Sequence, residues 1–541
     1  MKKIISLMLA ALMCLGLFSF VGCKKKVSND PQTLEIYVGN FGYGYNWLNA
    51  IIDEFEKEEW VREKYPELEI PDIQINSERN YGIDRTLSGD TNTIDLFFTA
   101  ATINTVVEKE YKNGQSFFAD LTDVYEGAVP GETDANGKPI LFKDKMDPNF
   151  TSMSIFTHKD NTKSYYSVPW VAGMTGLLYN KTWFDENKIG IPLTTDQLIQ
   201  ETCRDIRGKN QIPFVFSSKE SYWTFTLFLI WWAQYEGIAN YANFYQALVP
   251  DGMGGYTQSV DVVKQDGRRE SLEVIEDLIS VKETPKNIHD DVLTMDFGMA
   301  QAKFFLREGV MMPNGDWFEN EMRETAEEEG ITDTFTFMRT PVISAIKDKV
   351  PDGSIADDKE LQALIKAIDA EDPSLKGDGY DVTQKDYDKV KEARLIILPA
   401  ANHTAYIPSY ATAIEPAKDF LRYLATDKAC RAFIEATHGA NMPFEYDVEQ
   451  KDPALYNSLA QIQKDRLAWD KFGLYLPNEN TFKMAYLGKM YRLSFASSID
   501  ILLTVENDAE WMSAEDIYKA DIAWWTPTRW NNALINAGYK K

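Results

Sequence analysis

The N-terminal part of the sequence alternates short apolar strands with amphipathic helices, and this order restricts the possible folds more than any other feature. Residues 33–38 alternate apolar and polar side chains with a period of two, which is typical of a strand. A helical pattern follows over 47–63, and further strand patterns occupy 70–75 and 94–98. Strands and helices alternating at this spacing predict an α/β fold with a parallel, doubly wound sheet.

The first 22 residues have the pattern of a targeting segment. Lys2 and Lys3 precede a long apolar run that ends just before Cys23. This cysteine stands in an imperfect match to a bacterial lipobox, so we predict a lipoprotein signal peptide over 1–22, lipidation of Cys23 and a tether over 23–32. An ordinary signal peptide or a single anchor helix are the alternatives. Three lysines directly after the cysteine favour a position at the membrane surface.

The composition argues against several kinds of partner and site. A formal net charge of −27 is unfavourable for nucleic acid, because nucleic-acid affinity depends on clustered lysine and arginine. Beyond residue 23 the cysteines are Cys203 and Cys430, whose spacing fits no CxxC motif, and no two of the four histidines stand four residues apart. Residues 132–137 resemble half of an EF-hand loop, but Lys143 occupies position twelve. We therefore expect no metal and no cofactor.

A second informative stretch runs from 297 to 322. It predicts a helix, a short buried strand over 310–312, a turn, and a new helix that opens at Asp316. Ligands of open α/β sheets gather where strands end and helices begin. Asp316 followed by Glu319 is also a capping box, so the simplest interpretation of these two carboxylates is that they cap the second helix.

Three segments carry a resemblance to a known family. They are SVPWVAGMTGLLYNKTWFDENKI from residue 167, GMAQAKFFLREGVMMPNGDWFENEM from residue 298 and TAYIPSYATAIEPAKDFLRYLATDKACRAFIEATHG from residue 404. Together with the lipobox-like start, they resemble the extracellular solute-binding proteins of family 1, the carbohydrate-binding lipoproteins of ABC importers that include maltose-binding relatives. The similarity covers most of 33–440. The chain departs from it through insertions near 120–165 and 344–394 and through an extended C-terminus.

The resemblance implies an α/β fold of two lobes, periplasmic-binding-protein-like and of type II, joined by crossing hinge strands. The first lobe would combine 31–165 with 309–413, and the second would combine 166–308 with 414–541, including an extended helical C-terminus. Such a protein is expected to be a lipid-anchored monomer on the extracytoplasmic face of the cell membrane. It would capture a carbohydrate, expected to be an oligosaccharide, between the lobes and deliver it to the permease subunits of an ABC importer.

The same placement gathers strand-end loops around one cleft. Aromatic rings stack on the apolar faces of sugars, while carboxylates, amides and guanidinium groups form hydrogen bonds with the hydroxyls. The candidate ligand-binding residues are Asn40, Phe41, Tyr43, Glu78, Arg79, Trp170, Trp223, Asn314, Asp316, Trp317, His403 and Tyr410.

Two other functions are compatible with the sequence. A surface glycoside hydrolase or lyase would need two carboxylates about 5–10 Å apart, and Asp316 with Glu319 or Asp95 with Glu78 could supply such a pair. No GxSxG or HExxH motif is present, and we expect no enzyme. The other alternative is a surface lipoprotein that docks polysaccharide without transport.

Overall fold

The computed structural model describes most of the chain beyond residue 30. Its described residues are 31–540 except 79–80, 90–91, 102, 104–105, 108, 110–113, 159, 220–221, 281–285, 372–381, 401–402, 478–481, 483, 485–486 and 488–510. The predicted signal peptide and Cys23 lie outside this range. No helix within the described residues is long and apolar enough to cross a membrane.

The first lobe is built on a five-stranded sheet with the order β2-β1-β3-β15-β8. Strand β1 runs parallel to β2 and β3, which confirms the parallel sheet predicted from the N-terminal pattern. Strand β15 is antiparallel to both β3 and β8. The strands are β1 (Ile36–Gly39), β2 (Gln74–Asn76), β3 (Leu96–Thr99), β8 (Val168–Pro169) and β15 (Thr404–Tyr406).

Helices cover this sheet through regular apolar faces. Helix α2 (Asn46–Lys57) buries one face, and its Phe55 packs edge-on against Phe420 of α18 (Ile414–Tyr423) with ring centroids 5.1 Å apart. The other elements of this lobe are α3 (Glu59–Lys64), α4 (Tyr81–Leu87), α5 (Thr122–Tyr125), β4 (Ala128–Thr133), β5 (Pro139–Leu141), α6 (Phe142–Lys145), α7 (Pro148–Ser154), β6 (Ile155–Thr157), β7 (Lys163–Tyr165), α19 (Asp427–Ala436), α20 (Val448–Lys451) and α21 (Pro453–Ser458).

The second lobe is organised around β9 (Gly173–Asn180), an eight-residue strand that is buried throughout. Strands β12, β13 and β14 all pair antiparallel with β9, and β16 extends the sheet beside β14. A strand buried on both faces is mostly apolar, and GMTGLLYN fits this pattern except at Thr175 and at Asn180, whose side chain caps α8 (Lys181–Asn187). The partners are β12 (Met311–Gly315), β13 (Phe335–Met338), β14 (Ile396–Ala400) and β16 (Leu474–Tyr475).

The helices of the second lobe pack around α11 (Tyr222–Glu236) and α13 (Asp266–Ile279). Trp231 and Trp232 of α11 are fully buried, so their rings belong to the apolar core. The remaining elements are α8 (Lys181–Asn187), α9 (Thr195–Gln197), η2 (Leu198–Thr202), α10 (Cys203–Gly208), α12 (Ile238–Phe244), β10 (Leu248–Pro250), β11 (Tyr256–Gln258), η3 (Val260–Lys264), α14 (Phe297–Phe305), α15 (Phe318–Glu329), η4 (Ser344–Asp348), α16 (Asp358–Asp369), α17 (Gln384–Leu395), α22 (Gln461–Asp470), α24 (Ala514–Trp524) and α25 (Pro527–Asn536).

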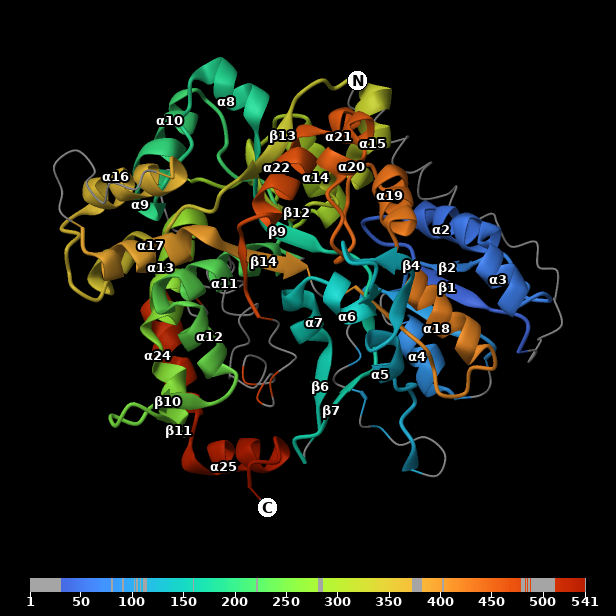
Figure 1. Cartoon of the computed structure of the whole chain (residues 1–541). Coiled ribbons are helices and arrows are strands. Elements are labelled where there is room, and N and C mark those ends of the chain that lie inside the picture. Colours follow the sequence, from blue (N-terminus) through green and yellow to red (C-terminus); the bar gives the residue numbers. More distant parts are fainter. Residues whose placement is uncertain are drawn as a thin grey trace.

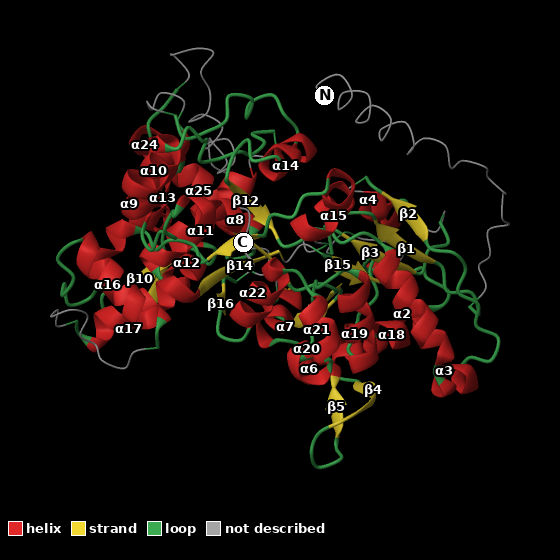
Figure 2. Ribbon diagram, turned by 90° about the horizontal axis from the view of Figure 1, so that it is seen from above, coloured by secondary structure: helices red, strands yellow, loops and turns green. Residues whose placement is uncertain are grey.

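The chain passes between the two sheets three times. It leaves the first sheet after β8 and enters β9, returns between β14 and β15, and leaves again between α21 and α22. Figure 1 shows the first lobe, in blue and orange, beside the green and gold second lobe, and the view from above in Figure 2 shows each sheet within its own group of helices. This arrangement confirms the two-lobed α/β fold with crossing segments.

The lobe boundaries predicted for the later part of the chain need correction. Residues 309–413 were expected in the first lobe, but β12, β13 and β14 belong to the second sheet, and the insertion near 344–394 lies with them through α17, which packs against α11. Residues 414–541 were expected in the second lobe, but α18 and α19 pack on the first. Apolar periodicity identifies a strand or a helix face without identifying the sheet that it joins.

Helix α24, near the C-terminus, is tied to α13 by a buried ion pair. Arg268 Nη2 lies 2.8 Å from Asp521 Oδ2, and each side chain is 1 % exposed. The same guanidinium donates to the carbonyl of Val263 at 2.7 Å. Removing one partner of such a pair leaves an uncompensated buried charge, which is much more costly than the loss of an exposed pair.

We therefore expect Asp521→Ala to lower the free energy of unfolding by about 3–5 kcal/mol. The measurement is urea unfolding followed by tryptophan fluorescence. The matched control is Lys519→Ala on the same helix, because Lys519 pairs with Glu515 at the surface, with side chains 66 % and 44 % exposed. The control should leave the midpoint almost unchanged, and equal shifts in the two variants would contradict the prediction.

Candidate functional site

The two lobes meet at a buried hydrogen bond between strand ends. Tyr43, in the loop after β1, donates from Oη to Asp316 Oδ1 at 2.6 Å, and Asp316 follows directly after β12. Asp316 Oδ2 lies 2.9 Å from Nε of Arg466 on α22. Asp316 and Arg466 are 0 % exposed, and Tyr43 is 2 % exposed. Three segments from distant parts of the sequence therefore meet at one carboxylate.

Gly173, where the crossing segment enters β9, makes room for this contact. A Cβ atom at this position would lie 2.2 Å from Tyr43 Oη and 3.3 Å from Asp316 Oδ1. The first distance is far below a van der Waals contact, so any side chain here would separate the tyrosine from the aspartate. The glycine is required by the close approach of the two lobes.

Arg466 is shared between two carboxylates. Its Nη2 lies 2.9 Å from Asp470 Oδ2 and also donates to the carbonyl of Ala172 at 2.9 Å. Asp470 in turn accepts a hydrogen bond from Tyr475. Burial raises the pKa of Asp316 to about 6, although Arg466 and Tyr43 act in the opposite direction. Burial also raises the pKa of Asp470, again against Arg466.

These contacts correct the capping interpretation of Asp316. Helix α15 begins at Phe318, its N-cap is Trp317, and no side chain caps it. Strand β12 extends to Gly315, so the predicted turn is part of the strand. Glu319 makes an ion pair with Arg323 at 2.7 Å within the helix. The carboxylate of Asp316 therefore contacts Tyr43 and Arg466 instead of the N–H groups of the helix.

Tyr43, Asp316 and Arg466 form the place where the lobes meet, which we call the corner. Aromatic rings surround Tyr43 there. Tyr43 makes edge contacts with Trp170, Trp317 and His403, with centroid distances of 6.0, 6.1 and 5.3 Å. Trp170 stacks on Trp47 at 4.7 Å and is 1 % exposed. Its indole N–H donates to the carbonyl of Thr99 at 3.2 Å. Trp170 therefore has no open face for a sugar in this structure.

A second contact between the lobes involves α15 and the loop after β1. Asn320 Nδ2 donates to the carbonyl of Gly42 at 2.7 Å. Glu321 accepts from Gln301 Nε2 at 2.8 Å and from the backbone N–H of Gly42. Burial raises the pKa of Glu321 to about 7. Trp317 lies against the backbone of the same loop. A Cβ atom added at Gly42 would be only 2.9 Å from the Cβ of Trp317.

The other predicted site residues fall into three groups. Asn40 and Glu78 are exposed, and Phe41 and Tyr410 are partly buried, with Asn92 Nδ2 donating to Tyr410 Oη at 2.6 Å. Asn314 is fully buried within β12. Arg79 lies outside the described residues, and Trp223 lies in α11 at a position whose side chain is not described.

Comparison with known proteins supports the fold independently. No family model matches the chain. The Multiple sugar-binding protein of Streptococcus mutans is 28% identical over 181 residues, which cover 31% of this chain and 39% of that protein. The match therefore spans well under half of the relative's length.

Solved structures match almost the whole chain. SBP RafE in complex with raffinose has a TM-score of 0.52 at 12% identity, covering 92% of this chain and 99% of that one. Maltose-bound MalE3 of T. maritima has a TM-score of 0.52 at 15% identity, covering 91% and 98%. A chitin oligosaccharide binding protein reaches 0.54 at 12% identity, covering 91% and 97%. The chain has the fold of the solute-binding proteins. This confirms the two-lobed α/β fold that the resemblance implies.

The aspartates of the two carboxylate pairs considered for a hydrolase, Asp95 and Asp316, are bound by other groups of the protein. Asp95 is 1 % exposed and accepts from the backbone N–H groups of Glu35, Thr412 and Ala413 at 2.7–3.1 Å. It therefore joins β3 to the segment before α18. Asp316 is held by Tyr43 and Arg466 as described. Neither aspartate is available to a glycosidic bond in this structure.

Arg466 and Asp470, which bind at the place where the lobes meet, were not predicted from the sequence. Arg466 and Asp470 stand four residues apart on α22, which is a recognisable helical ion pair. That pattern predicts only a local contact. The partner of Arg466 on β12 could be found only from the tertiary structure, as could the contact of Glu321 with the Gly42 loop.

The raised pKa of Glu321 gives a testable pH dependence. The folded protein holds this proton more tightly than the unfolded chain, so the stability that protonation provides is complete below pH about 4 and is lost as the pH rises through about 7. Glu321→Gln should match the wild type near pH 4.5 and exceed its free energy of unfolding at pH 8 by about 1–3 kcal/mol. Urea unfolding at the two pH values is the measurement.

The control for this experiment is Glu328→Gln, an exposed position on the same helix α15. It should show no change in relative stability between pH 4.5 and pH 8. If Glu321→Gln is no more stable than the wild type at pH 8, ionisation of Glu321 does not destabilise the folded protein, and the prediction is wrong.

Proposed function

We propose that this protein captures a carbohydrate, expected to be an oligosaccharide, between its lobes and delivers it to the permease of an ABC importer. The observation that carries the proposal is the meeting of strand ends from both lobes at Tyr43 and Asp316. Ligand sites of open α/β sheets lie at such strand ends. The names of the similar proteins, which include raffinose, maltose and chitin oligosaccharide, support a sugar as the ligand.

We assign direct contact with the sugar to the accessible residues at these strand ends. Phe41 offers a partly exposed ring, and Asn40, Glu78 and Tyr410 offer hydrogen-bonding groups. Arg79, next to Glu78 in the sequence, and Trp223 of α11 remain proposed contacts. Binding needs both a flat apolar surface and polar groups at its edge, and this set supplies both.

Other candidates contact the ligand only when the lobes separate. Tyr43 and Trp317 are covered in this structure by residues of the opposite lobe, so hinge opening would uncover them. Trp170 differs, because it stacks on Trp47 of its own lobe and stays covered whatever the hinge does. We propose that Trp170, His403, Asn314 and Asp316 support the site from behind.

The proposed site predicts a separation of binding from stability at Phe41. Phe41→Ala should weaken saccharide binding at least about tenfold, because a stacking surface worth about 1.5 kcal/mol is removed. The melting temperature of the free protein should stay nearly unchanged. Isothermal titration with raffinose, maltotriose, xylotriose and chitotriose identifies the ligand first, and the variant is then compared with it.

The matched control is Phe472→Ala, a 41 % exposed phenylalanine next to α22 whose ring is covered by Arg339. It should leave saccharide affinity unchanged. If Phe41→Ala loses stability but keeps its saccharide affinity, the ligand does not bind at this loop. If the protein binds none of the saccharides, a sugar-binding function is rejected.

We also propose that the protein is held at the extracytoplasmic face of the cell membrane through a lipid on Cys23. The lipobox-like sequence and the lysines that follow it support this assignment. Cys23→Ser should move the protein from the membrane fraction to the soluble fraction, since thiol lipidation becomes impossible. Fractionation and labelling with a fatty-acid analogue measure the change. Retention of Cys23→Ser in the membrane after a high-salt wash would instead indicate an anchor helix.

A further inference from the structure

A cavity of about 630 Å³ lies between the lobes, away from the corner described above. One side is formed by α6 and α7 and the segment 441–449, and the other by the end of α22 and Tyr475. The two segments of the first-lobe side are joined by backbone hydrogen bonds from Asp147 to Pro443 at 2.9 Å and from Glu445 to Lys145 at 2.8 Å. A volume of this size suits a small-molecule ligand.

The cavity and the sugar cleft lie on opposite sides of the crossing segment. Ala172 lines the cavity, while the next residue, Gly173, faces Tyr43 and Asp316. Successive residues of an extended chain point to opposite sides, so this alternation separates the two spaces. Asp470 also lines the cavity, on the far side of Arg466 from Asp316.

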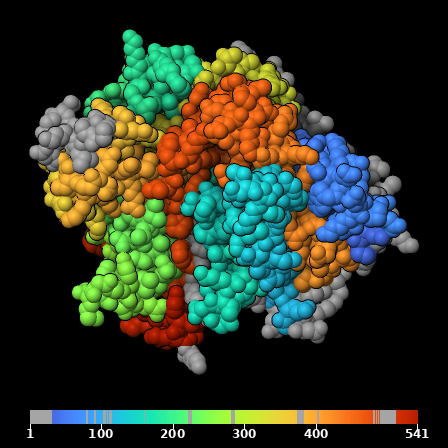
Figure 3. All heavy atoms as spheres, in the orientation of Figure 1, coloured from blue at the N-terminus to red at the C-terminus, as the bar shows by residue number. Residues whose placement is uncertain are grey.

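Segments outside the family resemblance build the walls. Residues 144–150 belong to the insertion predicted near 120–165, and residues 441–475 belong to the extended C-terminus. In Figure 3 the teal segment with α6 and α7 lies next to the orange segment with α20 to α22 on the face shown. The cavity is therefore a product of the parts of the chain that the sugar-binding function does not explain.

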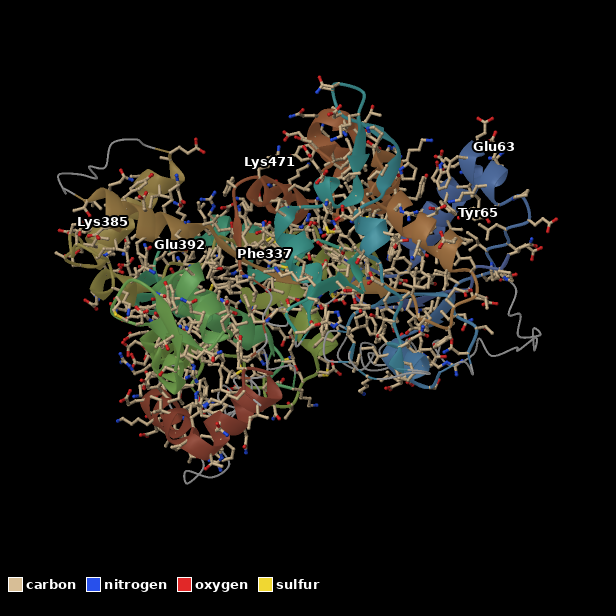
Figure 4. All side chains as sticks on the ribbon, turned by 60° about the horizontal axis from the view of Figure 1, so that its bottom comes forward. Glu63, Tyr65, Phe337, Lys385, Glu392 and Lys471 are labelled. Atoms are coloured by element: carbon tan, nitrogen blue, oxygen red, sulfur yellow. The ribbon has the colours of Figure 1, made fainter. Side chains whose placement is uncertain are left out.

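The lining is strongly acidic. It carries six carboxylates and two lysines. Lys145 is paired with Glu132 and Asp427, neither of which lines the cavity, at 2.9 and 2.7 Å. Lys471, which Figure 4 shows at the end of α22, pairs with Glu449 at 2.9 Å. Both lysine charges are therefore already compensated.

Among the described residues, three carboxylates of the lining have no cation paired with them, and one buried amide oxygen has no donor. Within the described part of the chain, Asp144, Asp147 and Glu445 make no ion pair, and the buried Oδ1 of Asn441 receives no hydrogen bond. Asp147 lies close enough to Asp470 to contribute to the raised pKa of its carboxyl group. Aromatic rings complete the wall, among them Phe150 and Tyr475, which meet edge-on at 5.6 Å.

We propose that this cavity is a second ligand site, distinct from the sugar cleft, and that it binds a small organic cation between Asp147 and Asp470. The ammonium group donates charge-assisted hydrogen bonds to the two carboxylates and to Asn441 Oδ1. The carbon skeleton packs on Tyr475, whose π face also attracts a cation. A neutral sugar would satisfy hydrogen-bond acceptors but would gain no charge attraction from Asp147, which is partly buried and has no cation partner among the described residues.

The test is isothermal titration of the full-length mature protein with ethanolamine, putrescine and spermidine at 150 mM NaCl. At least one of them should bind with one-to-one stoichiometry and a Kd below about 1 mM, since two charge-assisted contacts exceed the weak surface binding that this salt screens. Asp147→Asn should weaken that binding at least tenfold. Asparagine still accepts the capping hydrogen bond that Asp147 receives from Asn149, so helix α7 is preserved.

Asp357→Asn is the matched control, because the side chain of Asp357 also caps a helix, α16 in the second lobe, and does not line the cavity. Its cation affinity should equal that of the wild type. The proposal is overturned if none of the three cations binds, if Asp147→Asn binds as tightly as the wild type, or if the control loses the same affinity. Titration of Asp147→Asn with saccharides measures the affinity of the sugar cleft separately. The outcome of the cation experiment therefore neither supports nor rejects the sugar-binding proposal.

Discussion

The structure depends on one buried guanidinium that serves two carboxylates. Arg466 lies between Asp316, which receives the hydrogen bond of Tyr43, and Asp470, which receives that of Tyr475. Charges withdrawn from water in this way are tolerated only when each has a partner in good geometry. The requirement fixes the relative positions of α22, the end of β12 and the loop after β1. Those positions define where the lobes meet.

The same contact acts beside apolar packing. Each lobe has its own sheet, built on β1 to β3 and on β9, but one continuous cluster of buried apolar side chains runs through both lobes. The crossing segment between β8 and β9 is short, and Gly173 lets the lobes approach closely at its end. The contacts of Asp316 with Tyr43 and Arg466 add a defined geometry to this packing, because hydrogen bonds and ion pairs depend on direction as apolar contacts do not.

Much of this fold is predictable from the sequence, and the reasons for the failures are specific. The parallel order of β1 to β3 and the fully buried β9 follow from apolar periodicity, which is a local property. The lobe assignment of β12 to β14 was wrong because pairing is not encoded in that periodicity. Asp316 reads as a helix cap because Glu319 stands three residues later, yet its partners lie on other elements. Trp170 reads as a stacking surface, but the ring of Trp47 occupies the face that a sugar would need.

The distance along the chain between Asp316 and its partners has a consequence for the order of folding. Gln463, which donates to the carbonyl of Asp316, comes 147 residues later in the sequence, and Arg466 follows on the same helix. Until α22 docks, the carboxylate of Asp316 must remain hydrated, and the corner between the lobes stays open to water. The C-terminal segment therefore completes the molecule: a nascent chain that already contains every strand of the first sheet and the long strand of the second still lacks the cation around which they close.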